Sequence, residues 1–157
     1  MARANVFTSP GERDEEDPPG YRPAVVPIGK LAGGTALAVA VYELSENENV
    51  CPYHYEYEEE WLVVLDGTVI LRGPHGEHEL VAGDVVCFPP GPEGAHKVTN
   101  GGRQAARVLM FSSAQRPAVA VYPDSDKIGV WPGNADDDAI LRRSDGQRDY
   151  WDGEGER

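Results

Sequence analysis

The chain has 157 residues, 40% of them apolar, which is enough for one domain with a sizeable core. Its net charge of −13 argues against the Lys and Arg clusters that contact phosphate backbones, so we expect neither nucleic acid nor a membrane as a partner. No apolar run reaches about 18 residues and no secretory signal pattern opens the chain, so we expect a cytoplasmic protein.

Glycine and proline are frequent, with 18 and 13 residues, and favour a turn-rich all-β protein over a helical one. Residues 1–20 are polar, acidic and proline-rich, and they predict a flexible acidic arm with nothing to bury. From Tyr21 the apolar content rises, and residues 24–28 and 35–44 are the first strand candidates. Gly33 and Gly34 mark the turn between these two segments.

The stretch from Pro52 to Gly67 places potential metal ligands beside a buried strand. His54 and Glu56 share one strand face, because alternate side chains of a strand point the same way. Glu60 rejoins that face if residues 57–59 form a turn or a bulge. Residues 61–65 then form a buried apolar strand.

A second segment, from Gly83 to Asn100, adds His96 behind a turn rich in proline and glycine. Two imidazoles and two carboxylates that converge from neighbouring strands form a site for a divalent metal ion. The structural alternative is a core histidine beside a solvated glutamate run, and the specificity of the combined pattern favours a site. The expected metal ligands are His54, Glu56, Glu60 and His96.

The combined pattern resembles the two motifs of the cupin superfamily. The first motif is matched by His54-Tyr55-Glu56, three residues, Glu60, six residues and Gly67. The second motif is matched by Gly83, five residues, Pro89-Pro90-Gly91, four residues, His96, three residues and Asn100. This resemblance covers about residues 35–113 and implies a small single-domain cupin with an RmlC-like jelly roll, also called a double-stranded β-helix.

The chain departs from these motifs at three places. Glu48 occupies the position of the opening glycine, and two extra residues precede His96, which a surface turn absorbs. The third departure is chemical, because Glu56 replaces the second histidine of the first motif. Glu56 is either a fourth ligand, in a two-His, two-Glu site that cancels the charge of the cation, or it swings away and the metal is held weakly or not at all.

The resemblance implies that residues 21–122 form a cupin β-barrel, whose core motifs lie within residues 52–100. Asp66-Gly67 predicts a hairpin turn, residues 68–72 a strand, and residues 73–76 the next tight turn. We expect His75 and His78 at the surface, Cys87 as a small core residue, and Met110 near the pocket, in a last barrel strand at residues 105–112.

Residues 123–157 predict an irregular C-terminal tail after a strand at residues 119–122. We interpret Asp124, Asp126 and Lys127 as a capped turn rather than a site, and expect one short helical turn within residues 137–143. Tyr150 and Trp151 suggest that the tail packs on the barrel or on a partner subunit. Because small cupins commonly dimerise, the resemblance implies a homodimer.

Three functions are compatible with this site, because a fold does not fix a function. In the first, the chain is an enzyme that binds one divalent ion (Fe, Mn, Zn or Ni) and acts on a small oxygenated metabolite. Glu56 and Glu60 are then the catalytic candidates, with Glu56 as fourth ligand or as the base that moves a proton. The resemblance allows isomerase-, decarboxylase- or dioxygenase-like chemistry.

The second function is a non-catalytic module that binds a small ligand. No helix-turn-helix pattern accompanies it here, which weakens a regulatory role. The third is a degenerate, metal-free cupin scaffold in which Glu56 has abolished metal binding. We favour the enzyme, and we expect the two cysteines to form no disulfide framework, although Cys51 lies close to the site in the sequence.

Overall fold

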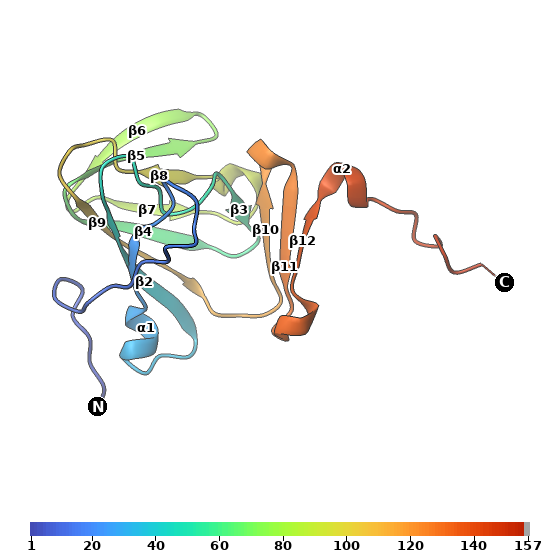
Figure 1. The fold of residues 1–157 in the computed structure, drawn as a ribbon, viewed down its shortest axis with the longest axis horizontal. Coiled ribbons are helices and arrows are strands. Elements are labelled where there is room, and N and C mark those ends of the chain that lie inside the picture. Colours follow the sequence, from blue (N-terminus) through green and yellow to red (C-terminus); the bar gives the residue numbers. More distant parts are fainter. Residues whose placement is uncertain (156–157) are drawn as a thin grey trace.

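The structure is a computed structural model that describes residues 1–155, and antiparallel strands dominate it (Figure 1). The strands are β1 (Ala24–Val26), β2 (Leu37–Leu44), β3 (Tyr55–Glu56), β4 (Glu60–Asp66), β5 (Thr68–Gly73), β6 (Gly76–Val81), β7 (Val85–Phe88), β8 (Lys97–Thr99), β9 (Ala106–Ser113), β10 (Ala118–Tyr122), β11 (Lys127–Trp131) and β12 (Ala139–Arg142). The short helices are α1 (Ile28–Leu31), α2 (Arg143–Gly146) and the 3₁₀ turns η1 (Pro92–Gly94), η2 (Pro123–Ser125) and η3 (Ala135–Asp137). Among residues 1–155, no helix combines the length and the apolar character that a membrane span needs.

The largest sheet has the strand order β1-β2-β9-β4-β7 and forms one layer of the barrel. In β4, Leu62 and Val64 are buried while their neighbours are half-buried, so alternate residues face the core. In β9, Val108 and Met110 follow the same alternation. The hydrophobic alternation of the sequence therefore sets which face of this sheet is covered.

A three-stranded sheet of order β6-β5-β8 covers that face (Figure 1). Val69 and Leu71 of β5 and Val98 of β8 pack against the larger sheet and complete one apolar cluster. The cluster contains Leu44, Leu62, Val64, Val69, Leu71, Phe88, Val98, Ala106, Val108 and Met110. Two antiparallel layers around one core confirm the expected all-β jelly roll.

The turn at Asp66-Gly67 is not a hairpin, contrary to the sequence prediction. β4 pairs with β7 and β9, whereas β5 pairs with β6 and β8, so the chain crosses between sheets at Gly67. Gly67 has a φ of 78°, and a Cβ there would lie 2.9 Å from the Cα of Ala106. The Asp-Gly dipeptide indicates a sharp turn of the chain, but it does not indicate which strands pair.

The tight turn between β5 and β6 agrees with the sequence prediction, since Gly73 pairs with Gly76. His75 in this turn and His78 in β6 are exposed, as expected.

The prediction of Cys87 as a core residue is wrong. Its neighbours Val86 and Phe88 pack in the core, and because successive residues of a strand face opposite ways, the half-buried Cys87 of β7 points away from it. Cys87 forms no disulfide.

The N-terminal arm lies against the barrel. Glu12 forms a β-bridge with Val25, and the Arg13 guanidinium lies 2.9 Å from the Glu48 carboxylate. Glu48 therefore ties the arm to the loop after β2, which gives a structural use to the residue at the motif's glycine position.

Residues 118–142 form most of a third sheet, of order β12-β11-β10-β3. The prediction of an irregular tail is therefore wrong for β11 and β12, where alternation such as Ile128-Gly129-Val130 prevails over the surrounding turn signals. The sheet stands at one side of the barrel and is joined to it through β3, and the chain leads away after α2 (Figure 1). Tyr150 and Trp151 are exposed and pack edge to face, with ring centroids 4.8 Å apart.

Candidate metal centre

An isolated β-bridge brings His54 and His96 together. The His54 amide donates to the His96 carbonyl at 3.1 Å, and the His96 amide donates back at 2.8 Å. Directly opposed residues of an antiparallel pair carry their side chains on the same face. The two imidazole centroids accordingly lie 4.7 Å apart, although 42 positions of sequence numbering separate the residues.

The two extra residues before His96 are absorbed by η1. This turn follows Gly91, which has a φ of 85°, and the Gly94 amide donates to the Gly91 carbonyl at 2.9 Å. A Cβ at Gly94 would lie 1.8 Å from the carbonyl oxygen of Pro89, so the turn accepts only glycine there. The folded turn returns the chain to the bridge with His54, despite the longer loop.

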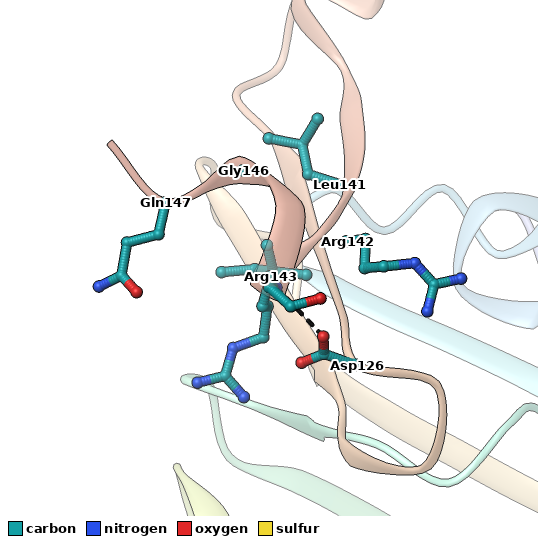
Figure 2. Close-up of a pocket in the computed structure, with 8 residues that line it drawn as sticks. Asp126, Leu141, Arg142, Arg143, Gly146 and Gln147 are labelled. Carbon is teal, nitrogen blue, oxygen red and sulfur yellow. Dashed lines mark hydrogen bonds between the residues drawn. The ribbon is translucent and has the colours of Figure 1, made fainter. Parts of the chain in front are cut away.

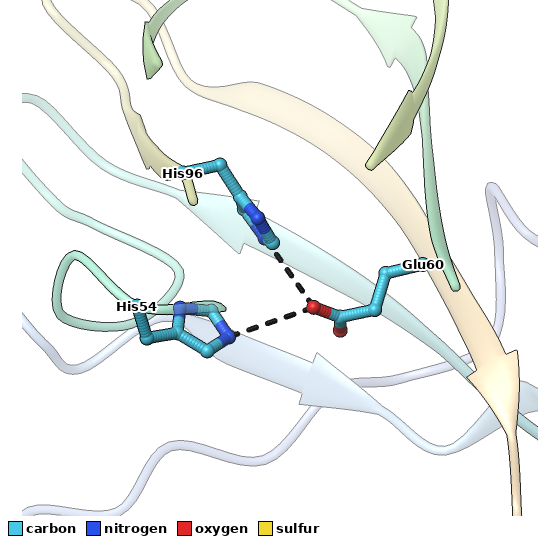
Figure 3. Close-up of side chains that lie close together, drawn as sticks. All are labelled: His54, Glu60 and His96. Carbon is cyan, nitrogen blue, oxygen red and sulfur yellow. Dashed lines mark ion pairs between the residues drawn. The ribbon is translucent and has the colours of Figure 1, made fainter. Parts of the chain in front are cut away.

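Glu60 is the first residue of β4 and follows the bend at residues 57–59 that its position requires. Its Oε2 lies 3.7 Å from Nε2 of His54 and 3.7 Å from Nε2 of His96 (Figure 3). The ligand atoms of the three residues all lie within 4.8 Å of one another. We call these residues the His-Glu-His group. Ligand atoms at this separation fit around one cation after small side-chain adjustments.

Both imidazoles direct a lone pair at the glutamate. Nδ1 of His96 lies 2.9 Å from the Gly94 carbonyl oxygen, and Nδ1 of His54 lies 3.0 Å from that of Pro52. A carbonyl only accepts, so each Nδ1 carries the hydrogen and each Nε2 is left as an acceptor. Within the described part of the chain, the buried Nε2 of His96 has no hydrogen-bond partner. The two lone pairs and an ionised carboxylate repel one another unless a cation or a proton lies between them.

Burial controls the charges in this group. It lowers the pKa of His96 to about 3, with a further contribution from His54, and it also lowers the pKa of His54. Burial raises the pKa of Glu60 to about 8, assisted by the charge of Glu56. At pH 7, without a cation, all three groups are therefore neutral. The contacts drawn as ion pairs in Figure 3 have the distance of an ion pair, but their side chains carry no opposite charges in this state. A bound cation favours the ionised form of Glu60.

Two aromatic rings fix the imidazole planes. Phe88 stacks on His96 with centroids 3.6 Å apart, and Tyr122 stacks on His54 at 5.8 Å. The Cys51 sulfur lies 3.5 Å from Nδ1 of His54. The sequence did not single out Tyr122 as a site residue, because β10 lies outside both motifs and only the pairing of β10 with β3 brings it here.

Glu56, the fourth expected ligand, lies outside the His-Glu-His group. It pairs with Ala120 of β10 and is half-buried. Burial raises its pKa, an effect that Arg116 opposes. Its charge still helps to raise the pKa of Glu60, so Glu56 lies beside the group without joining it.

A small cavity opens beside Glu60, with a volume of about 100 Å³. Its walls come from β2, β4 and β9, namely Ala38, Val39, Ala40, Tyr42, Glu60, Met110, Phe111 and Ser112. Met110 thus lies at a pocket, as the sequence indicated. Because one water occupies about 30 Å³ of liquid, the cavity accommodates only a small molecule or one end of a larger one.

A cavity of about 480 Å³ lies among β11, β12 and α2, which contribute nothing to the His-Glu-His group. Figure 2 shows that the Asp126 carboxylate faces the start of α2, where it accepts a hydrogen bond from the Ser144 amide at 3.1 Å. Asp126 has a φ of 52°, which agrees with its interpretation as a turn residue. Its carboxylate is thus occupied structurally, and we assign this cavity no chemistry.

Residues 40–112 match the family model described as the cupin domain. The chain carries a cupin domain. This finding confirms the resemblance to the cupin superfamily, and the matched range contains the whole His-Glu-His group. A search of curated proteins finds no match to the chain.

Several solved structures share the fold of this cupin. A provisionally assigned sugar phosphate isomerase from Acidithiobacillus ferrooxidans is 21% identical, with a TM-score of 0.80 and 91% of each chain covered. A cupin-superfamily sugar phosphate isomerase from Silicibacter pomeroyi is 25% identical, with a TM-score of 0.71, covering 85% of this chain and 82% of that one. The polyketide cyclase RemF from Streptomyces resistomycificus is 21% identical, with a TM-score of 0.60, covering 75% and 83%. The likenesses at 21% identity show the fold alone.

Proposed function

We propose that this cupin is a metal-dependent enzyme that acts on a small oxygenated molecule, with one divalent ion held by His54, Glu60 and His96. The observation that carries this proposal is the buried Nε2 of His96, which faces Glu60 and has no partner within residues 1–155. A buried acceptor without a partner costs about 1–3 kcal/mol, and coordination of a cation removes that cost. The donor set of two imidazoles and one carboxylate suits iron, manganese, zinc or nickel.

We assign Glu56 to proton transfer rather than to coordination of the metal ion. The charge of Glu56 acts on Glu60 of the His-Glu-His group, and burial raises the pKa of Glu56 itself. A glutamate with a raised pKa both accepts and returns a proton more readily near neutral pH. The replacement of the motif's second histidine thereby supplies a base where a ligand is usual.

The cavity beside Glu60 is where the substrate would bind. Tyr42 and Ser112, which both carry a hydroxyl group, are among its lining residues. Burial raises the pKa of Tyr42 to about 12, so its hydroxyl stays a hydrogen-bond donor. When bound, the metal ion supplies Lewis-acid polarisation of a carbonyl or hydroxyl oxygen. The chain's own residues orient the substrate, limit its size and exclude water from Glu60, whose side chain is only 14% exposed.

Among reaction classes we favour an isomerase-type proton transfer between neighbouring carbons of a hydroxycarbonyl compound. Such a reaction needs a polarised oxygen and one base, and it consumes no second substrate. The 25% identical relative described as a sugar phosphate isomerase supports this class. Decarboxylase- and dioxygenase-like reactions are the alternatives, and oxygen uptake and carbon dioxide release distinguish them.

The metal content of protein purified without an affinity tag tests the proposal. We expect about one equivalent of a divalent transition metal in the wild type after supplementation, and loss of that metal in Glu60→Gln. Glu79→Gln is the matched control, because Glu79 is an exposed glutamate of β6. A wild-type protein that takes up no metal would instead support the scaffold function, and retained metal without turnover would support the binding module.

We also propose that the protein is a homodimer. Exposed Ile140 and Leu141 of β12, and Tyr150 and Trp151 of the tail, support a contact with a second copy. Sedimentation analysis tests this, with an Ile140→Ser, Leu141→Ser double variant expected to shift the protein to monomer. A wild type that sediments as a monomer at micromolar concentration would refute the dimer.

A further inference from the structure

Two of the three lysines of this acidic chain line one pocket. Lys97 lies in β8 and Lys127 in β11, so strands of two different sheets bring them together. The pocket has a volume of about 440 Å³, within the usual range for small-molecule sites. We call it the lysine pocket, and its lining residues are Asp17, Pro18, Tyr21, Val50, Cys51, Pro52, Tyr53, Lys97, Asp124, Ser125 and Lys127.

Neither lysine takes part in an ion pair within residues 1–155. Each ammonium instead lies over a tyrosine ring. The Lys97 nitrogen is 5.6 Å from the Tyr21 centroid, and the Lys127 nitrogen is 5.3 Å from the Tyr122 centroid. Cation–π contacts of this length orient an ammonium group without neutralising its charge. Both charges therefore stay available to a ligand.

The acidic residues of the pocket do not cancel these charges. Asp124 is already paired with the Arg72 guanidinium, whose Nη1 and Nη2 lie 2.5 and 3.0 Å from Oδ2 and Oδ1 of Asp124. Asp17 is exposed and belongs to the N-terminal arm. With Arg72 balancing Asp124, two ammonium groups face a single rim carboxylate, so the pocket is positive within a chain of net charge −13.

We propose that the lysine pocket binds a small phosphate monoester, with the phosphate held by Lys97 and Lys127. A phosphate monoester carries a charge of about −1.5 to −2 at pH 7. This charge balances two ammonium groups more closely than the single charge of a carboxylate does. Inorganic phosphate alone leaves most of 440 Å³ unfilled. Tyr21, Tyr53 and Ser125 are among the other lining residues, and their rings and hydroxyl groups suit an organic part with hydroxyl groups.

The lysine pocket is distinct from the cavity beside Glu60. The two share no lining residue, and the pocket approaches the His-Glu-His group through Cys51 and Pro52, which both lie at Nδ1 of His54. The Cys51 sulfur lies 3.5 Å from Nδ1 of His54, closer than its 4.0 Å from Nε2, the nitrogen that faces Glu60. A ligand in the pocket therefore binds behind His54, and its binding does not depend on the proposed metal chemistry.

Calorimetric titration with glycerol 3-phosphate tests this site, with inorganic phosphate and glycerol as the two partial probes. We expect saturable binding of glycerol 3-phosphate, weaker binding of phosphate and none of glycerol. Lys97→Gln and Lys127→Gln should each weaken binding at least about tenfold, which corresponds to one lost charge-assisted contact. Lys30→Gln, on α1, removes the same charge outside the pocket and should leave the affinity unchanged.

Three results would overturn the inference. They are no saturable binding of glycerol 3-phosphate, equal weakening in Lys30→Gln, and unchanged affinity in both pocket variants. Each titration is run on metal-free and metal-loaded protein, with thermal unfolding to verify the fold of every variant. Binding that requires metal and survives both lysine substitutions would place the phosphate at the His-Glu-His group, which refutes this site and leaves the metal proposal standing.

Discussion

Metal binding should release a proton from Glu60, because burial raises the pKa of this residue to about 8 in the metal-free protein. At that pKa, about 0.9 of the carboxyl groups are protonated at pH 7 and about 0.1 at pH 9. The lowered pKa values of His54 and His96 leave both imidazoles neutral at pH 7, so neither contributes a proton. Zinc binding should thus release about 0.9 protons at pH 7 and about 0.1 at pH 9.

Calorimetry in two buffers of different ionisation enthalpy measures this number directly. The apparent affinity for zinc should rise by nearly tenfold per pH unit below about pH 8 and level off above it, because deprotonation of Glu60 then costs nothing. Glu79→Gln should behave like the wild type, whereas Glu60→Gln should release no proton and bind zinc far more weakly. Zinc binding without proton release at pH 7, or unchanged release in Glu60→Gln, would show that Glu60 is not the ligand that titrates.

Three further substitutions test the cavity, the crossing between sheets and the motif asparagine. Ala40→Leu should fill the 100 Å³ cavity and reduce turnover or ligand affinity at least about tenfold, with metal content unchanged in elemental analysis. Gly67→Ala should lower the free energy of unfolding in urea more than Gly83→Ala, because both have positive φ but only Gly67 meets backbone. Asn100→Ala should cost about 1–3 kcal/mol in the same assay, because its buried side chain bonds two backbone carbonyls and one amide.

The sequence predicted the His-Glu-His group well because the spacing of its residues reflects strand geometry. His54 and Glu60 lie on either side of the bend at residues 57–59, which brings them to the same face. His96 follows the turn η1, which Gly91 and Gly94 allow to fold tightly. The same spacing placed Glu56 on the shared strand face, but it could not show that Glu56 pairs with β10 and lies outside the group. The glutamate at position 56, where the motif has its second histidine, was the sequence feature that indicated a different role for this position.

Features that depend on long-range pairing could not be read from the sequence. The third sheet forms because β10 finds β3, which precedes it by more than 60 positions of sequence numbering, and this pairing also brings Tyr122 to His54. The lysine pocket likewise combines β8, β11 and the N-terminal arm, and Lys127 alone looks like part of a turn. The only hint in the sequence was that lysine is rare in this acidic chain. The fold is needed to show that two of the lysines line the same pocket.

The position of a bound metal ion tests the central claim most directly. Crystals soaked with zinc and measured at its absorption edge should show one anomalous peak, about 2.0–2.2 Å from Nε2 of His54, Nε2 of His96 and one carboxylate oxygen of Glu60. A peak at other residues, or no peak at the His-Glu-His group in zinc-saturated crystals, would contradict the assignment of these three side chains as metal ligands.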